Sequence, residues 1–497
     1  MKKKIILIIF FICFIIPLLI DLKTIYFGLF PFWFDPAQSL LLGLDNLNKF
    51  SLIGHPSGGI FGLFYGPYDI WLICILQLIS KDPRLIVFGL YMLPYFTIFP
   101  FILYKFSKLF GKFPALAMWV LYILHFNSFA TRIWNPNPAP ILALWVIYLL
   151  ITINLNKNIQ HTLLRILFVG VLVGLLANFH LSFGLIFMIG VFISQIIFMS
   201  YLKTKSKKII LLLCVYILGI LITFIPFMLF EIRHNFLQTK ALLNLLTSHV
   251  ATLGPVFSKL QIITHFLSGF SDLVGLPVVL SNILLIILLA LFVNYLIKHK
   301  KQTLEYEKKL VIILLTLTLV ILGSYLGYRR VIWDYYFIGT EIIFLLFLGY
   351  LLSKYKILKF LFTVWILIVL FSSSYTFFLN IKNTDYIYGS LASKEEAVKI
   401  IGKDANNINY VVFAYDNAIY TYDYSYLFKW LYAKNFSYDP GSIMKNQKIV
   451  YLIIPPDGNL QRIENFVNYY TPNRYYLNNK TWELADGLVI LKKIRNY

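Results

Sequence analysis

Apolar runs of membrane-spanning length, separated by short basic loops, fill the chain from Ile5 to Leu379. About 20 consecutive apolar residues cross the hydrocarbon core of a bilayer as a helix, and roughly a dozen segments approach that length. The pattern therefore predicts an all-α polytopic membrane protein. The expected spanning segments lie near residues 85–104, 114–130, 138–153, 163–178, 182–200, 209–230, 275–297, 310–326, 336–352 and 358–378.

Basic residues predict the orientation of these segments, since loops rich in Lys and Arg stay on the cytoplasmic side. Residues 2–4 are lysines, and the helix 5–20 that follows lacks a small-residue cleavage site, so we expect an uncleaved first helix with a cytoplasmic N-terminus. All basic loops fall on the cytoplasmic side only if the segment 60–79, which contains Pro67, does not cross the membrane; otherwise a neighbouring segment must be split in two. We favour a non-crossing segment, and about 11 crossings in all.

From residue 380 the pattern of hydrophobic and polar residues becomes that of a small α/β domain, which the predicted topology places outside the cytoplasm. A helical pattern covers 394–402, strand-like runs cover 410–414 and 449–454, and 482–493 suggests a closing strand. We therefore expect a transmembrane domain at 1–379 and an extracytoplasmic domain at 380–497.

Composition supports a membrane protein and argues against other classes. Of 497 residues, 59% are hydrophobic and 13% charged, which is not the balance of a soluble globular domain. The net charge of +22 arrives in loop clusters that encode topology, so no nucleic-acid partner is expected.

Asp35 is the leading candidate for chemistry. It follows the first helix in an aromatic setting, where a carboxylate has a raised pKa and suits a general base. Capping of a helix that begins near Pro36 is the alternative.

Other candidates lie in turn-rich outer segments. His55 and Tyr65 belong to a loop expected to cover a cavity, and Asn135 and Asn137 follow Arg132 in a tight loop suited to binding hydroxyls or a phosphate. Interfacial anchoring by Arg132 and Trp134 is the alternative for that loop.

Polar residues also end the apolar helices on the outer side. His180, Glu231 and His234 could form a polar pocket, and Arg233 could meet an anion there, although helix ends ordinarily meet water with such residues. The two histidines and Glu231 are also metal-ligand types, without a spacing motif, so no metal site is assigned and a divalent metal stays open. Arg329 and Arg330 lie outside against the positive-inside bias, which makes them candidates for a phosphate; pairing with Asp334 or headgroups is the alternative.

The order and sidedness of these motifs over residues 1–380 resemble the GT-C class of membrane glycosyltransferases, specifically the family of dolichyl-phosphate-mannose protein mannosyltransferases and bacterial lipid A sugar transferases. The resemblance implies a GT-C-like helical bundle, a polyprenyl-phosphate sugar donor, and Asp35 as the catalytic base or the group that positions the acceptor. The acceptor is an envelope lipid, glycan or protein. Relatives commonly carry a second acidic residue in the loop that here reads Arg132 to Asn137, whereas this sequence has asparagines there. A metal or two-carboxylate mechanism is therefore not implied.

Alternative functions predict different patterns. A transporter should carry ionisable groups near mid-membrane, whereas the polar groups here gather at one face. A polymerase or ligase of lipid-linked oligosaccharides shares the outer-face chemistry, and a non-catalytic scaffold predicts that Asp35 is replaceable. Membrane lipids are partners under every alternative.

Overall fold

The computed structural model describes residues 15–57, 62–155, 158–247, 258–299, 304–328, 332–379, 389–406, 409–415, 421–433 and 448–496. For 124–130, 245–246, 370 and 372–379 it describes the backbone alone.

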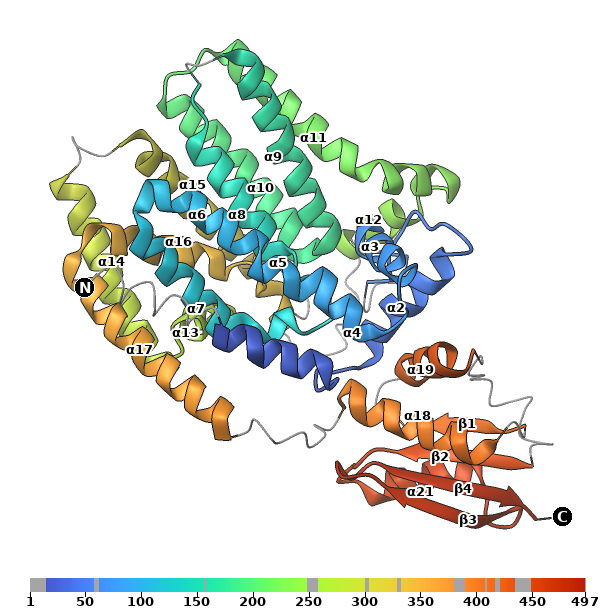
Figure 1. Ribbon diagram of the computed structural model, residues 1–497. Helices are drawn as coiled ribbons and strands as arrows, with labels where there is room; N and C mark the ends of the chain where they lie inside the picture. The colour runs from blue at the N-terminus through green and yellow to red at the C-terminus, as the bar shows by residue number, and fades with distance from the viewer. Residues whose placement is uncertain are drawn as a thin grey trace.

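A bundle of long helices forms most of the molecule (Figure 1), and each of the ten spanning segments expected from hydropathy coincides with helix. The first of these is a continuous run of α4 (Pro83–Ile86), η1 (Val87–Met92), α5 (Leu93–Phe96) and α6 (Ile98–Phe110). The others are α7 (Lys112–Ala130), α8 (Ala139–Thr152), α9 (Ile159–Phe179), α10 (Leu181–Tyr201), α11 (Ser206–Arg233), α14 (Val278–Lys298), α15 (Glu305–Gly327), α16 (Glu341–Lys354) and α17 (Lys356–Leu379).

Seven helical runs within the described part of the chain are long and apolar enough to cross a membrane. The chain is therefore a multi-pass membrane protein. The segment that broke the alternation contains α3 (Tyr68–Gln77), whose ten residues rise only about 15 Å, half the thickness of the hydrocarbon core. Its length agrees with the non-crossing interpretation.

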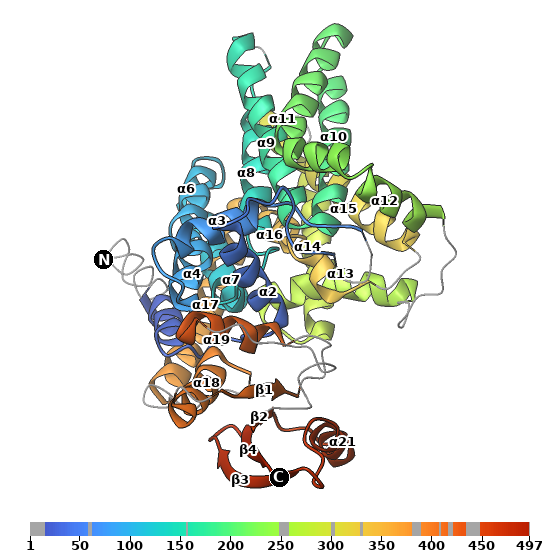
Figure 2. The ribbon, with the colours of Figure 1, turned by 90° about the vertical axis from the view of Figure 1, so that its right-hand side faces the viewer.

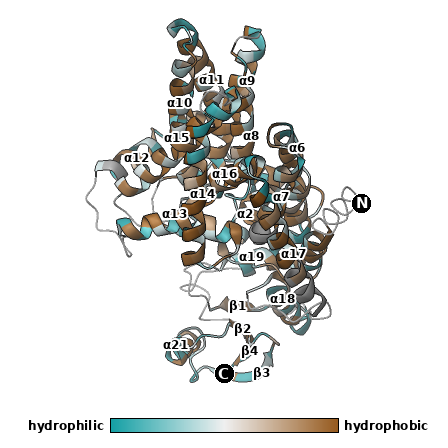
Figure 3. Cartoon of the chain, turned by 90° about the vertical axis from the view of Figure 1, so that its left-hand side faces the viewer, coloured by the Kyte–Doolittle hydropathy of each residue, from teal (hydrophilic) through white to brown (hydrophobic). Residues whose placement is uncertain are grey.

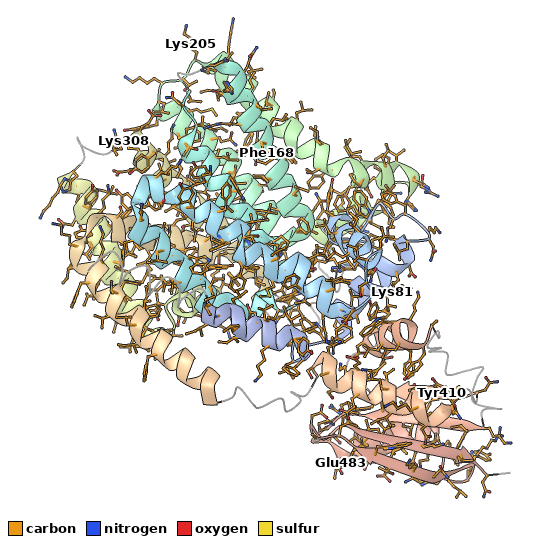
Figure 4. All side chains as sticks on the ribbon, viewed as in Figure 1. Lys81, Phe168, Lys205, Lys308, Tyr410 and Glu483 are labelled. Atoms are coloured by element: carbon orange, nitrogen blue, oxygen red, sulfur yellow. The ribbon has the colours of Figure 1, made fainter. Side chains whose placement is uncertain are left out.

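The two ends of the bundle differ in character. Lys205 and Lys308 lie at the end far from the C-terminal domain, whereas Lys81 lies beside that domain (Figure 4). Hydrophobic residues cover the helices, and hydrophilic residues concentrate at the tips of α9–α11 and in the C-terminal domain (Figure 3). Shorter helices lie in the half of the bundle nearer the C-terminal domain (Figure 2), namely α2 (Phe34–Asn46), α3, α12 (Leu237–Thr247) and α13 (Lys259–Val274). The short helix η2 (Asp334–Phe337) precedes α16 in the chain.

Glycine contacts bring α9 and α11 unusually close. A Cβ at Gly170 would lie 2.2 Å from the carbonyl oxygen of Tyr216, and one at Gly219 would lie 2.3 Å from that of Leu167. Small residues allow such backbone approach in membrane helices. The contact joins the middle of α9 to α11, and α9 continues from there to the candidate site.

The C-terminal domain is α/β, in agreement with the expectation from sequence. Its four-stranded sheet has the order β1 (Val411–Ala414), β2 (Ile449–Ile454), β4 (Val489–Arg495), β3 (Tyr476–Glu483). β1 pairs with β2 in parallel and the other pairs are antiparallel. The described helices are α18 (Leu391–Ala405), α19 (Tyr422–Tyr432) and α21 (Leu460–Tyr470). The domain boundary after residue 379 stays a prediction.

One strand expectation for this domain was wrong. The stretch 482–493 is not a single closing strand but the end of β3, a turn, and β4. The turn forms because Asp486 and Gly487 favour reversal, and Gly487 adopts a φ of 84° that suits glycine.

Candidate active site

Asp35 lies in the first turn of α2, and its carboxylate does not cap that helix. The N-cap is Trp33, with no side-chain capping bond, and the Trp33 indole Nε1 donates to Asp35 Oδ2 at 3.1 Å. Burial raises the pKa of Asp35 above its ordinary value of 3.8, while the indole bond and the nearby His55 oppose that rise. The site therefore holds a half-buried carboxylate of increased basicity.

A short hairpin places His55 and Tyr65 beside Asp35. Backbone bonds join its two sides, from Gly54 N to Tyr65 O at 2.9 Å and from Tyr65 N to His55 O at 3.0 Å. The two rings lie 4.6 Å apart. Burial lowers the pKa of His55 below 6.5, so its imidazole is mainly neutral at neutral pH.

The loop 131–138 forms another wall of the site. Asn135 is buried, hydrogen-bonds the His55 side chain, and donates from Nδ2 to the Phe179 carbonyl at 2.6 Å. Asn137 Nδ2 donates to the Arg132 carbonyl at 2.7 Å, and Tyr95 OH donates to the Asn137 carbonyl at 2.8 Å. These bonds make the loop a preorganised support.

Aromatic rings connect these walls. The Trp134 ring lies 6.2 Å from Trp33 and 5.7 Å from Tyr335, which belongs to η2. Tyr335 also hydrogen-bonds Tyr65, and its carbonyl lies 3.0 Å from His180 Nε2. His180 is completely buried and supports the η2 backbone. The structure thus gathers segments far apart in sequence around Asp35.

Arg132 is the cationic residue of the loop 131–138. It is half-buried, which lowers its pKa, and within the described part of the chain its buried Nε has no hydrogen-bond partner. An anion would supply that missing partner. Arg329 and Arg330 lie outside the described residues.

Glu231, Arg233 and His234 lie at the corner between α11 and α12. Glu231 accepts from the backbone of Gln238 and Thr239, both at 2.8 Å, so it caps α12. His234 Nδ1 lies 2.9 Å from the Phe230 carbonyl, and Arg233 is exposed. His180 has different partners, namely Tyr335 and Ser182, so among the described residues no printed bond joins it to Glu231 and His234. Gln238 links this corner to the hairpin by accepting from Phe64 N at 3.0 Å.

Asp69 is a second buried acid, and it supports the Trp134 loop through Tyr91. Asp69 accepts from Tyr91 OH at 2.9 Å, and Tyr91 in turn hydrogen-bonds the Trp134 backbone. Burial raises the pKa of Asp69 to about 6. In the described ranges, no three His, Cys, Asp or Glu side chains gather in a way that would hold a metal ion.

Sequence reasoning missed the structural roles of Trp33 and Tyr335. Trp33 had one available signal, its position two residues before Asp35 in an aromatic run. Tyr335 had no local signal, because it reaches the site from 300 residues away.

Comparisons with known proteins identify the fold. No family model matches the chain, and no curated protein matches it in sequence. Two crystal structures of ArnT from Cupriavidus metallidurans match over 96% of this chain and 97% of theirs. The apo structure gives a TM-score of 0.56 at 8% identity, and the structure bound to undecaprenyl phosphate gives 0.57 at 9% identity. The protein therefore has a GT-C-like fold.

Proposed function

We propose that the protein transfers a sugar from a polyprenyl-phosphate donor to a hydroxyl of an envelope acceptor at the outer face of the membrane. The observation that carries the proposal is the half-buried Asp35 carboxylate, which interacts with His55. The loop 131–138, which bonds His55 through Asn135, also holds Arg132, whose Nε has no partner among the described residues. A GT-C-like fold shared with a protein bound to undecaprenyl phosphate supports the donor class.

The proposed reaction is one direct displacement at the anomeric carbon. Asp35 takes the proton of the acceptor hydroxyl, and the oxygen forms a bond to the anomeric carbon as the carbon–oxygen bond to phosphate breaks. The leaving polyprenyl phosphate keeps the bonding electron pair. Because the acceptor oxygen attacks the face opposite the leaving phosphate, the configuration at that carbon inverts. The increased basicity of Asp35 favours the proton transfer.

Arg132 is the residue whose surroundings best suit the departing phosphate, since a guanidinium binds phosphate oxygens and stabilises charge that develops on them. Arg233, Arg329 and Arg330 stay predicted phosphate ligands. His55, Tyr65, Asn135 and Asn137 are proposed to orient the donor sugar or the acceptor. For His180, Glu231 and His234, the observed bonds favour support of the surrounding backbone.

The orientation is part of the proposal. The Lys205 and Lys308 end of the bundle would face the cytoplasm, because basic loops remain there. The site and the C-terminal domain would then face the opposite side, where a lipid-linked donor meets envelope acceptors.

Transfer of radiolabel from polyprenyl-phosphate sugars to cell-envelope acceptors tests this function. Membranes with the wild type are compared with membranes holding Asp35→Asn at equal expression. We expect transfer by the wild type and a loss of at least about a hundredfold in the variant, the contribution of general base catalysis. Equal transfer by both would exclude Asp35 as the base, and no transfer of any sugar would favour a polymerase or a scaffold.

A further inference from the structure

The C-terminal domain contacts the chain segment that leads directly into Asp35. Residues 28–32 lie beside residues 389–392, and the two segments form an antiparallel bridge between Pro31 and Ser390. The flanking backbone bonds are Ala392 N to Gly28 O at 2.9 Å, Leu391 N to Phe30 O at 3.1 Å, and Phe32 N to Gly389 O at 2.9 Å. Asp35 lies only three residues beyond the last of these bonds.

Helix α19 holds the rest of α2. It lies beside α2 in both ribbon views (Figures 1 and 2). The Tyr426 ring lies 6.3 Å from Phe32, at the entry to α2, and Lys429 Nζ lies 3.0 Å from Asp45 Oδ1, in its last turn. Both ends of the helix that carries Asp35 are therefore attached to the C-terminal domain.

A partly buried ion pair locks the same junction. Arg84 Nη2 donates to Glu395 Oε2 at 2.6 Å, and Glu395 is 6% exposed. The guanidinium also lies against the 28–32 segment, since a Cβ at Gly28 would be 2.9 Å from Arg84 Nη2. Arg84 lies in the first turn of the first long helical run of the bundle, so the pair joins the bundle, the 28–32 segment and α18 at one point.

The apolar packing also joins α18 and α19 to the bundle. Phe30, Phe32, Leu391 and Tyr426 belong to one buried cluster that continues into the bundle. A separate small cluster, which includes Phe413 and Val450, lies within the sheet. Helices α18 and α19 are thus packed with the site, whereas the far face of the sheet has a core of its own.

We propose that α18 and α19 position Asp35 for catalysis by clamping the 28–32 segment and both ends of α2. This inference rests on the proposed function. Glu395 and Arg84 are positioning residues under this proposal, because they act through α2 and touch no reacting atom. A displacement of about 1 Å in a reacting group can lower a rate by roughly a hundredfold.

Kinetics of the full-length Glu395→Gln variant in lipid nanodiscs test the clamp, with the radiolabelled donor as the probe. We expect kcat to fall roughly ten- to a hundredfold while the donor KM stays unchanged. The acid limb of the pH profile should also move to lower pH, because a loosened α2 admits water to Asp35 and weakens the burial that raises its pKa.

Other charged groups around α2 do not account for that shift. His55 and Tyr65 face Asp35 from the hairpin and keep their own contacts in the variant. On the packed helices, Asp69 of α3 is bonded to Tyr91, and Lys429 of α19 pairs with Asp45 at the far end.

Asp404→Asn provides the matched control. Asp404 pairs with Lys492 at 2.6 Å, and both residues lie within the C-terminal domain. This variant should keep the wild-type kcat and pH profile. Tyr426→Phe, which removes a 2.5 Å bond from its hydroxyl to the Lys81 carbonyl, repeats the test with a smaller change if Glu395→Gln does not fold.

The outcomes separate this inference from the function on which it rests. Folded Glu395→Gln or Tyr426→Phe proteins with wild-type kcat would overturn the clamp and leave the function standing. A lower kcat with an unmoved acid limb would also overturn it, because the contact would then be structural only. A wild type that transfers no sugar would overturn both proposals.

Discussion

Replacement of Gly66 by alanine should separate the hairpin from α9 and displace His55 and Tyr65 from the site. A Cβ at position 66 would lie 2.1 Å from Asn178 Oδ1 and 2.5 Å from Asn178 Cβ. Asn178 cannot turn away easily, because it is buried and its Nδ2 donates to the Gly174 carbonyl at 2.8 Å. The backbone bond from Gly66 N to Asn178 O, 3.1 Å in the structure, would then lengthen or break.

The cost follows from the size of this clash. Overpacking at a well-packed site typically costs about 1–3 kcal/mol of stability. The shift of the hairpin by a substantial fraction of an ångström should lower transfer roughly a hundredfold, since binding and orienting groups tolerate little displacement. Thermal unfolding in detergent and radiolabel transfer measure the two effects separately.

Two further variants sharpen the result. Gly323→Ala lies on α15 with no atom within 4 Å of the added Cβ, so it should leave transfer unchanged. Gly66→Ala combined with Asn178→Gly removes the clashing side chain and should recover most of the transfer activity. The double variant should be about 1 kcal/mol less stable, because glycine is unfavourable in a helix. A Gly66→Ala protein with wild-type transfer would refute the reasoning.

The remaining predictions concern charges at the site. Transfer by the wild type should rise with pH through a pKa above 3.8, because only the ionised Asp35 accepts a proton; an acid limb at or below 3.8 in the pH–rate profile would contradict this. Arg132→Met should lower kcat about a hundredfold, and Arg132→Lys less, when transfer kinetics are compared; equal rates would remove Arg132 from the phosphate site. Asp69 has a pKa raised from 3.8 to about 6 in the fold, so the wild type should lose roughly 2 kcal/mol of stability as pH rises from 4 to 8. Asp69→Asn should not show that loss when thermal unfolding is measured at pH 4 to 8. The same dependence of stability on pH in both proteins would refute the raised pKa of Asp69.

The helical bundle was predictable because each spanning helix is specified locally. Length and apolar composition alone distinguish such a segment, as for α9 and α10, which match the predicted 163–178 and 182–200 within a few residues. The pairing of residues 54–57 with residues 62–66 was anticipated only as a shaped loop, since glycine and proline mark turns without giving their partners.

The detailed site was not predictable because its contacts join distant segments. Asp35 and His55 were both identified in sequence, but nothing local indicated that Tyr335 would bond Tyr65. Glu231 shows a further role that the sequence did not indicate, since this carboxylate at a helix end caps α12; its place in a binding pocket stays a prediction. The clamp by α18 and α19 likewise depends on pairing between residues about 360 positions apart, for which one sequence holds no signal.

The most direct test of the account measures polyprenyl phosphate released from a polyprenyl-phosphate sugar by purified protein in nanodiscs supplied with an envelope acceptor extract. The account predicts acceptor-dependent release by the wild type, and release at least about a hundredfold slower by folded Asp35→Asn protein that still binds the donor. Equal release by the two proteins would contradict it, because the carboxylate on which the mechanism depends would then contribute nothing.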